Sequence, residues 1–322
     1  MPTPAPLPDD RSQLLSMAPG RLWVQDLGPL AQTGETGEAS EPAVLMLHSL
    51  LVTGWDFRVL SRRYAEAGRR VVVPDLFGCG NSDRPDALDT SGYGFRWHAE
   101  LLEGMLARLE VPAVDLIAHG YGGSIAIELA RRLQRPSAGA QLRRLVLIAP
   151  HLLPVDAPIA LPGPMPRLRR AWDWVGFAPL VFRTVFRRAD LRRFLLRSLS
   201  TPDLLDSPEL RDDVDVYWDR LCRTGGLEAT QAMLEQLDEL HVPRIDGVRD
   251  HLYAAASSVE RPTMVVWGDR DRINPTSLAE PSAKLLPNAE LRIIEGCGHA
   301  PQRERPEALM RTIETFDRRM KG

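Results

Sequence analysis

The sequence predicts an α/β fold in which helices flank a mostly parallel sheet and a helical segment is inserted between two strands. Short apolar runs alternate with amphipathic stretches, which is the pattern of parallel strands joined by crossover helices. Residues 151–258 break this alternation with a stretch rich in Pro, Trp, Leu and Arg that is helical in pattern. A chain of 322 residues is long enough for one large domain with such an insertion.

Each expected strand is a short apolar run bounded by turn residues. The strands are predicted over 21–27, 43–48, 69–76, 113–119, 142–150, 263–269 and 290–296. The clearest helices, with apolar residues at helical spacing, are predicted over 96–110, 122–134 and 303–319. We therefore expect a flexible, Pro-rich N-terminus (1–20), a core domain (21–150 and 259–322) and a helical cap or lid (151–258).

Composition narrows the possible partners and the compartment. A net charge of −3 does not favour nucleic acid as a partner. The three cysteines are too scattered for a disulfide framework or a zinc site, and they suit a reducing cytosol. No leader-like segment or apolar run of about 18 residues is present, so a cytoplasmic location is expected. No phosphate loop, dinucleotide fingerprint or metal cluster is found, so no cofactor is expected.

Several separate segments carry the motifs that bear on function. They are VLMLHSL (44–50), VVPDLFGCGNSDRP (72–85), LIAHGYGGS (116–124), VVWGDRDRINP (265–275) and EGCGHAPQRERPE (295–307). In order and spacing these segments resemble the α/β-hydrolase fold superfamily, whose capped members include epoxide hydrolases, carbon–carbon bond hydrolases and esterases. The resemblance covers roughly residues 20–319 and is weakest in the cap.

The resemblance implies a catalytic triad of which two members are present. The family order of nucleophile, acid and histidine falls on Gly120, Asp271 and His299. The family acid is the last Asp of a GxxD turn, which selects Asp271 over Asp269. A carboxylate at this position holds the imidazole in one tautomer and orientation. The nucleophile position itself carries a glycine.

The same resemblance implies an oxyanion hole made from backbone N–H groups of Leu50 and Tyr121. Ser49 stands where the family commonly has glycine, so its hydroxyl either points toward the pocket or serves the structure. Two other residues could replace the missing nucleophile. Ser124 is expected to face the interior, and Cys297 would need a lowered thiol pKa.

A pocket between the sheet and the cap is expected to bind a medium-sized, partly apolar small molecule. The expected lining residues are Trp55, Phe57, Tyr121, His151, Trp172 and Trp218. The cap segment 167–197 also holds nine arginines against two aspartates. These arginines are expected to form a solvated lid face; contact with an anionic membrane surface or a phosphate-bearing substrate is the alternative. The oligomeric state is left open.

Gly120 leaves three hypotheses for function. In the first, His299 acts as general base on a water that occupies the space left by the missing hydroxymethyl group, or directly on a substrate, in a non-covalent hydrolase or lyase. The second is a pseudoenzyme that binds a ligand without turnover. The third is a serine hydrolase whose nucleophile has been mutated. Under the third hypothesis, Gly120→Ser is expected to restore ester hydrolysis.

Overall fold

The computed structural model describes residues 10–29, 41–85, 93–153, 186–205, 207–238, 240 and 247–321. These residues form one eight-stranded sheet with the strand order β1-β2-β4-β3-β5-β6-β7-β8. β2 is antiparallel to β1 and β4, and the other neighbouring pairs are parallel. The strands are β1 (Gln13–Met17), β2 (Gly20–Leu27), β3 (Ala43–Leu47), β4 (Val71–Pro74), β5 (Ala113–His119), β6 (Gln141–Ile148), β7 (Thr263–Gly268) and β8 (Ala289–Ile294).

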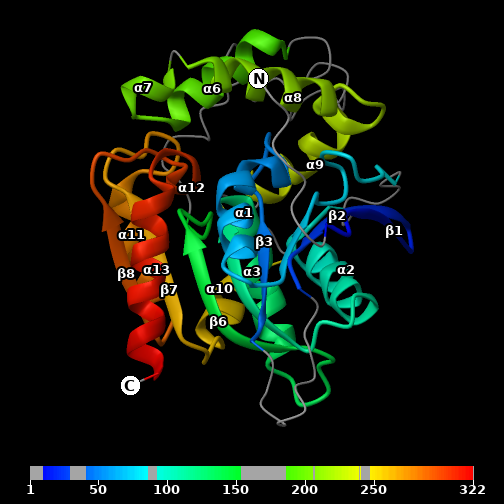
Figure 1. Cartoon of the computed structure of the whole chain (residues 1–322), viewed down its shortest axis with the longest axis vertical. Coiled ribbons are helices and arrows are strands. Elements are labelled where there is room, and N and C mark those ends of the chain that lie inside the picture. Colours follow the sequence, from blue (N-terminus) through cyan, green and yellow to red (C-terminus); the bar gives the residue numbers. More distant parts are fainter. Residues whose placement is uncertain are drawn as a thin grey trace.

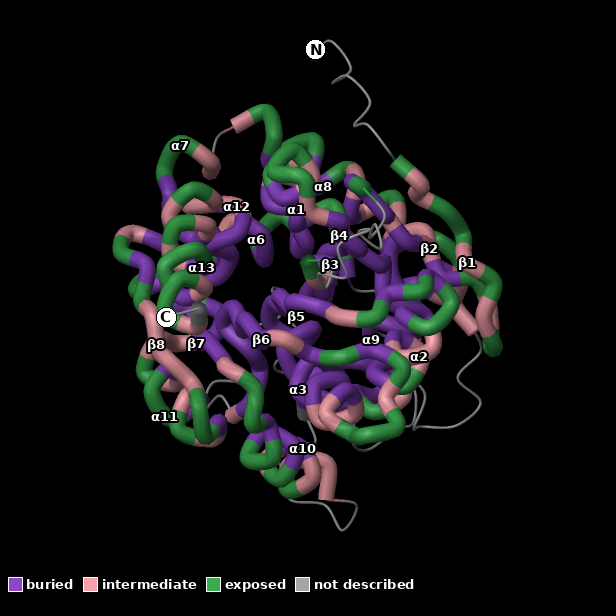
Figure 2. Tube along the Cα trace, turned by 60° about the horizontal axis from the view of Figure 1, so that its bottom comes forward, coloured by how far each residue is buried: buried purple, intermediate pink, exposed green. Residues whose placement is uncertain are grey.

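The central strands are buried on both faces, which explains their continuous apolar sequences. All residues of β3, β4 and β7 are buried, and Figure 2 shows the buried centre of the sheet beside the more exposed β1. Parallel strands require helices on both faces of the sheet, so a period-two pattern of polar residues is absent from them. Because Leu47 pairs with Ala118 and His119 with Ile148, β3, β5 and β6 end at one edge. The loops that follow them therefore gather there.

Helices cover both faces of the sheet (Figure 1). One face packs against α2, α3 and α10, and the other packs against α1 and α13. Within the described ranges, no helix has both the length and the apolar character of a membrane span. The helices of the core are η1 (Gly54–Phe57), α1 (Arg58–Glu66), α2 (Phe95–Arg108), α3 (Tyr121–Leu133), α10 (Val248–Ser257), η2 (Thr276–Leu278), α11 (Ala279–Lys284), α12 (Pro301–Glu304) and α13 (Pro306–Lys321).

A helical segment lies between β6 and β7 in the chain. Its described helices are α6 (Arg188–Ser198), α7 (Pro202–Leu205), α8 (Pro208–Leu221) and α9 (Gly226–Asp238), and we call residues 186–240 the insert. Helix α6 packs against α8. Figure 1 shows α6, α7 and α8 at the top, beyond the ends of the strands. The insert therefore lies over the edge at which the loops after β3, β5 and β6 gather.

Three boundaries differ from the sequence prediction. The N-terminus expected to be flexible (1–20) contains β1, which pairs with β2 through five residues. The expected cap (151–258) includes α10, but α10 packs against α3 on the core, where His251 bonds to Glu128. The cap boundary at 258 therefore lies too far along the chain. The expected helix 303–319 is two helices, because α12 ends before Arg305 and a proline starts α13.

Candidate active site

The turn between β5 and α3 depends on glycine. Gly120 has φ 52° and ψ −116°, a backbone conformation that L side chains rarely adopt. A Cβ at Gly122 would lie 2.6 Å from the carbonyl oxygens of Leu47 and His48. These glycines let the first turn of α3 pack directly against the end of β3.

Asp271 and His299 form the hydrogen bond that the sequence predicts. Asp271 follows β7 and His299 follows β8, and Nδ1 of the imidazole lies 2.7 Å from Oδ2 of the carboxylate. The other carboxylate oxygen accepts the backbone N–H groups of Ile273 and Asn274, each at 2.8 Å. Because the Nδ1–H donates to Asp271, Nε2 of the neutral ring is left as a proton acceptor. The pair has the arrangement of a general base and its orienting carboxylate.

Ser49 points its hydroxyl at the Gly120 turn. Its Oγ accepts the backbone N–H of Tyr121 at 3.2 Å. A Cβ built on Gly120 would lie 2.2 Å from this Oγ and 2.9 Å from the Cβ of Ser49. His48 fixes the loop, since Nδ1 donates to the Ser49 carbonyl (2.8 Å) and Nε2 accepts the N–H of Leu76 (2.9 Å). Ser49 therefore fills the volume that a side chain at position 120 would need.

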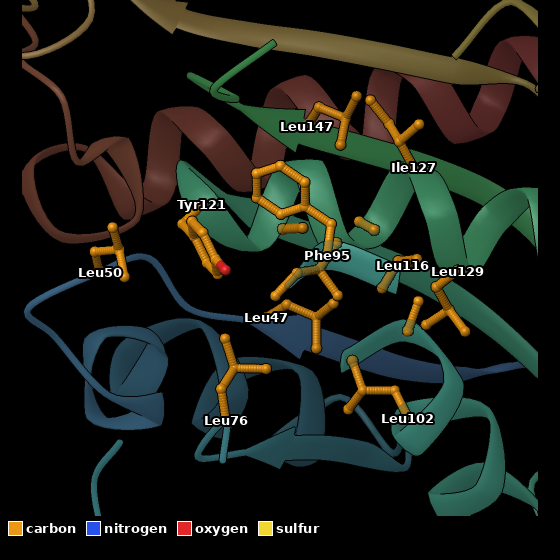
Figure 3. Close-up of a cluster of buried hydrophobic side chains, with 14 of the residues drawn as sticks. Leu47, Leu50, Leu76, Phe95, Leu102, Leu116, Tyr121, Ile127, Leu129 and Leu147 are labelled. Carbon is orange, nitrogen blue, oxygen red and sulfur yellow. The ribbon is translucent and has the colours of Figure 1, made fainter. Parts of the chain in front are cut away.

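The side chains of Leu50 and Tyr121, whose backbone N–H groups are the expected oxyanion donors, belong to the core. Figure 3 shows both side chains within the buried apolar cluster, and the Tyr121 hydroxyl donates to the carbonyl of Tyr93 at 2.6 Å. Burial raises the pKa of the Tyr121 phenol well above its ordinary value, so the phenol stays neutral. The expectation that the Tyr121 ring lines a pocket is therefore wrong. The N–H of Tyr121 faces Ser49, and the N–H of Leu50 has no acceptor among the described residues.

Two of the four described non-glycine residues with positive φ lie in the loops beside Gly120. Leu51, after β3, has φ 63°, and Ala149, after β6, has φ 41°. Each such conformation of a non-glycine residue costs about 1–3 kcal/mol and persists only where its surroundings enforce it. The Asn274 side chain supplies part of that enforcement by donating to the carbonyls of Ala149 (3.2 Å) and Pro150 (3.0 Å). Asn274 thus connects the acid loop to the strained loop after β6.

His151 lies beside the same turn, as expected for a site residue. Its N–H donates to the Gly120 carbonyl at 3.2 Å, and its ring centroid is 5.9 Å from that of His299. Its Cδ2 lies 3.6 Å from the position of a Cβ on Gly120. Ser124, considered above as a substitute nucleophile, is fully buried and donates its hydroxyl to the His151 carbonyl. Its hydroxyl therefore serves the structure of this loop.

The cysteines near the site are not activated thiols. Burial raises the pKa of Cys297 far above its ordinary value and that of Cys79 to about 12. The Cys297 N–H donates to Asp269, which is therefore engaged away from His299. In the described parts of the chain, no three His, Cys, Asp or Glu side chains come together as a metal site requires.

The insert is bonded directly to the loop that carries His299. The His299 N–H donates to the carbonyl of Ser198 at 2.7 Å. The buried Glu304 carboxylate accepts the N–H of Ser200 (2.7 Å) through one oxygen and the N–H of Gly298 (2.8 Å) through the other. One carboxylate thus holds the end of α6 and the histidine loop together.

A second buried network lies behind His299. His119 directs Nε2 at the His299 carbonyl (2.9 Å), and their ring centroids are 4.6 Å apart. The Gln302 amide nitrogen bonds to Nδ1 of His119 (2.9 Å) and to Asp56 (2.6 Å). Burial lowers the pKa of His119. Although burial acts to raise it, the pKa of Asp56 is held well below its ordinary value by His119 and Arg303. The buried network of His119, Gln302 and Asp56 therefore packs against the loop that carries His299.

Two of the three tryptophans expected to line the pocket make other contacts. Trp55 is 43% exposed, and its indole N–H donates to Asp213 of α8 at 2.9 Å. Arg58 lies over the Trp55 ring and also bonds to Asp213. Trp218 stacks on Phe186 with ring centroids 6.1 Å apart. Trp55 therefore connects the core to the insert, and Trp218 packs within the insert.

Of the two other expected lining residues, only Phe57 is among the described residues. Phe57 is fully buried in the cluster beneath α1 and α13, on the core side of its helical turn. Trp172 lies outside the described residues, as does the first part of the Arg-rich stretch, 167–185. The expectation for Phe57 is wrong, and that for Trp172 stays a prediction.

Some residues of the site were not found from the sequence. Asn274 and Glu304 lie within segments that were singled out, RINP and RERPE, but their contacts join loops that are distant in the chain. A polar residue that recurs beside the acid or the histidine is the signal that could have identified them. Asp56 carries no such signal, because its partners lie at 119, 302 and 303.

Known proteins resemble this chain over most of its length. The model of the alpha/beta hydrolase family matches residues 44–312. The 2-hydroxymuconate semialdehyde hydrolase of Pseudomonas putida is 31% identical over 251 residues, which are 77% of this chain and 76% of that protein. Among solved structures, epoxide hydrolase CorEH has a TM-score of 0.71 at 19% identity, covering 96% of this chain and 99% of its own. A mutant of the meta-cleavage product hydrolase CumD has a TM-score of 0.70 at 18% identity, covering 96% and 98%.

The structural neighbours agree with the strand order and with the helices on both faces of the sheet. The family match extends from β3 into α13 and so includes the Gly120 turn, Asp271 and His299. The chain belongs to the alpha/beta hydrolase family.

Proposed function

We propose that the protein is a hydrolase in which Nε2 of His299 acts as the general base in the hydrolysis of a carbonyl-containing small molecule. The observation that carries this proposal is the buried 2.7 Å hydrogen bond between His299 and Asp271, which leaves Nε2 as the acceptor. Backbone N–H groups of Leu50 and Tyr121 supply the oxyanion donors. Esters and carbon–carbon bonds next to a carbonyl both fit this arrangement, and the name of the Pseudomonas putida relative favours the second.

The source of the attacking oxygen is limited by Ser49. Residue 120 offers no hydroxyl, and a water placed where its side chain would begin meets the Ser49 Oγ, which is 2.2 Å from that position. This contact disfavours the form of the non-covalent hypothesis in which a water replaces the missing hydroxymethyl group. It also disfavours a simple loss of a serine at position 120, because that serine would have collided with Ser49.

Turnover assays with His299 variants test the proposal. p-Nitrophenyl esters of increasing acyl length and 2-hydroxymuconate semialdehyde are suitable substrates. His299→Ala is expected to lower kcat/KM by about 10³-fold or more, and Asp271→Asn by about 10²–10⁴-fold, because the base loses its lone pair or its tautomer. His251→Ala, on α10, is the matched control and is expected to retain the parent rate. Equal rates for the parent and His299→Ala would refute the proposal.

A second candidate function is ligand binding without turnover. The observation that favours it is the occupied Tyr121 N–H, which donates to Ser49 rather than standing open to a substrate oxygen. This candidate predicts that a carbonyl compound binds, by calorimetry, with equal affinity to the parent and to His299→Ala, and is recovered unchanged. Consumption of the compound by the parent, but not by His299→Ala, supports the hydrolase instead.

A further inference from the structure

Ser49 places a buried hydroxyl where the family fold presents its reacting group. Its side chain is 5% exposed, and its Oγ lies 2.2 Å from where a side chain on Gly120 would start. A serine and a glycine thus stand in exchanged positions on two loops that face each other across the carboxyl edge of the sheet. The Ser49 side chain belongs to the loop after β3, but its hydroxyl lies at the turn after β5.

We propose that Ser49 is the nucleophile of this protein, with its Oγ acting in place of a side chain at position 120. The inference rests on the proposed function, since it uses the same base, His299. It assigns the reaction a covalent acyl-enzyme step on the loop after β3.

The surroundings of the hydroxyl fit a nucleophile. The Tyr121 N–H donates to Oγ at 3.2 Å and so holds the hydroxyl at the Gly120 turn. Among the described residues, the Ser49 hydroxyl donates to no acceptor, so its proton is available. His48, bonded to the Ser49 carbonyl and to the Leu76 N–H, holds the loop in place. Burial lowers the pKa of His48, which keeps that ring neutral in this role.

The ring of His151 lies close both to the Gly120 turn and to the ring of His299. His151 is 3.6 Å from the Cβ position of residue 120, and its ring is 5.9 Å from the ring of His299. The structure has no hydrogen bond between Ser49 and His299. Bonds of this kind are often long in free enzymes and tighten when a substrate is bound.

The reaction balances with water as the only co-reactant. The Ser49 Oγ forms a bond to the carbonyl carbon while its proton passes to Nε2 of His299, and the Nδ1–H stays bonded to Asp271. The carbonyl oxygen of the substrate gains the negative charge and accepts a hydrogen bond from the Leu50 N–H. The bond to the leaving group then breaks as His299 returns the proton to that group. A water attacks the acyl–Ser49 ester in the same way and regenerates both residues.

Ser124 provides a matched control. It is buried, lies four residues after Gly120 and carries the same hydroxyl, but it donates that hydroxyl to the His151 carbonyl. If any serine near the turn were reactive, both would be labelled. The proposal predicts reaction at Ser49 alone.

The test is covalent labelling of the full chain with a fluorophosphonate, followed by intact mass measurement and peptide mapping. One adduct on Ser49 is expected in the parent and in Ser124→Ala, and none in Ser49→Ala or Ser49→Gly. The labelling rate is expected to fall by about 10²-fold or more in His299→Ala. In the double exchange Ser49→Gly with Gly120→Ser, the adduct is expected to move to position 120. Circular dichroism of each variant checks that it folds. The position of the adduct in the parent protein tests the proposal even if a variant fails to fold.

The outcomes separate this inference from the proposed function. Turnover that depends on His299 but persists in Ser49→Ala, without an adduct, overturns the nucleophile and leaves the hydrolase. An adduct on Ser124 or any other residue also overturns it. Absence of both turnover and labelling refutes both proposals. An adduct on Ser49 in a protein that hydrolyses none of the tested substrates supports the nucleophile and points to a different substrate.

Discussion

Gly120 and Ser49 share one small volume, so each limits what the other can be. We expect Gly120→Ser alone to lower the free energy of unfolding by about 2–4 kcal/mol, because its Cβ meets the Ser49 Oγ and its φ becomes strained. Adding Ser49→Gly is expected to bring stability back to within about 2 kcal/mol of the parent, since only the strain remains. Urea unfolding of the parent, both single variants and the double variant measures this coupling.

Additive effects of the two substitutions would contradict this arrangement, because residues in contact are expected to show a coupling energy. The same contact bears on the expectation from the sequence that Gly120→Ser by itself restores ester hydrolysis, which stays a prediction. A serine at position 120 requires the Ser49 side chain to move or to be replaced by glycine.

The sequence predicted the Asp271–His299 bond because both residues follow strands whose ends meet, and the motif fixes their spacing. It could not predict where the Ser49 hydroxyl points, since its partner is the N–H of Tyr121, 72 positions away in the chain. Trp55 was misplaced for a similar reason. Its partner Asp213 is 158 positions away in the chain, on a helix whose docking no local pattern reveals.

At the scale of elements, α6 and the histidine loop are held together by Glu304. Its buried carboxylate accepts donors from Ser200, Thr201 and Gly298. We expect Glu304→Gln to lower the free energy of unfolding by about 2–3 kcal/mol, because its amide presents N–H groups to donors. It is also expected to speed proteolysis of the chain near 200–206. Urea unfolding and timed thermolysin digestion measure the two effects, because this segment offers leucines but no Lys or Arg at which trypsin could cut.

Glu307→Gln is the control for this variant. Glu307 pairs with Arg63 on the surface, with both side chains about half exposed, so its loss is expected to change stability by less than about 0.5 kcal/mol. Equal stabilities of the Glu304 and Glu307 variants would show that the insert does not depend on the carboxylate network.

The strands of the core were predictable because each is a short apolar run with helices on both sides. The missed strand, β1, is exposed on most of its residues, so it offers no apolar run, and its stability comes from pairing with β2. α10 was assigned to the cap because it follows the cap helices in sequence. Only packing reveals that its small residues Ala255 and Ala256 face α3.

At the scale of the whole molecule, buried histidines make stability depend on pH. Burial lowers the pKa of His98 to about 4, and it also lowers those of His48 and His119. Between about pH 6.5 and pH 4 the unfolded chain binds protons that the folded chain excludes, so stability is complete above this window and is lost as the pH falls. His98 alone accounts for about 3 kcal/mol of this loss by pH 4.

Urea unfolding at pH 7.5 and pH 4.5, at constant salt, measures this dependence. The parent is expected to be less stable at the lower pH, and His98→Gln is expected to reduce the difference. Carboxylates with lowered pKa, among them Asp56, Asp115 and Glu128, also lose their contribution to stability as the pH falls below about 5, so the comparison of the parent with His98→Gln isolates the effect of His98. An unchanged difference in His98→Gln would show that this ring is not the titrating group.

The contact between positions 49 and 120 also restricts how sequences of this kind can change over time. A chain with serine at both positions is destabilised, because a Cβ at position 120 falls 2.2 Å from the Ser49 Oγ and one of the two must shift. A chain with glycine at both positions meets no such clash. A lineage that moves the hydroxyl from one loop to the other by single substitutions therefore passes either through this crowded chain or through an ancestor that has no hydroxyl at either place.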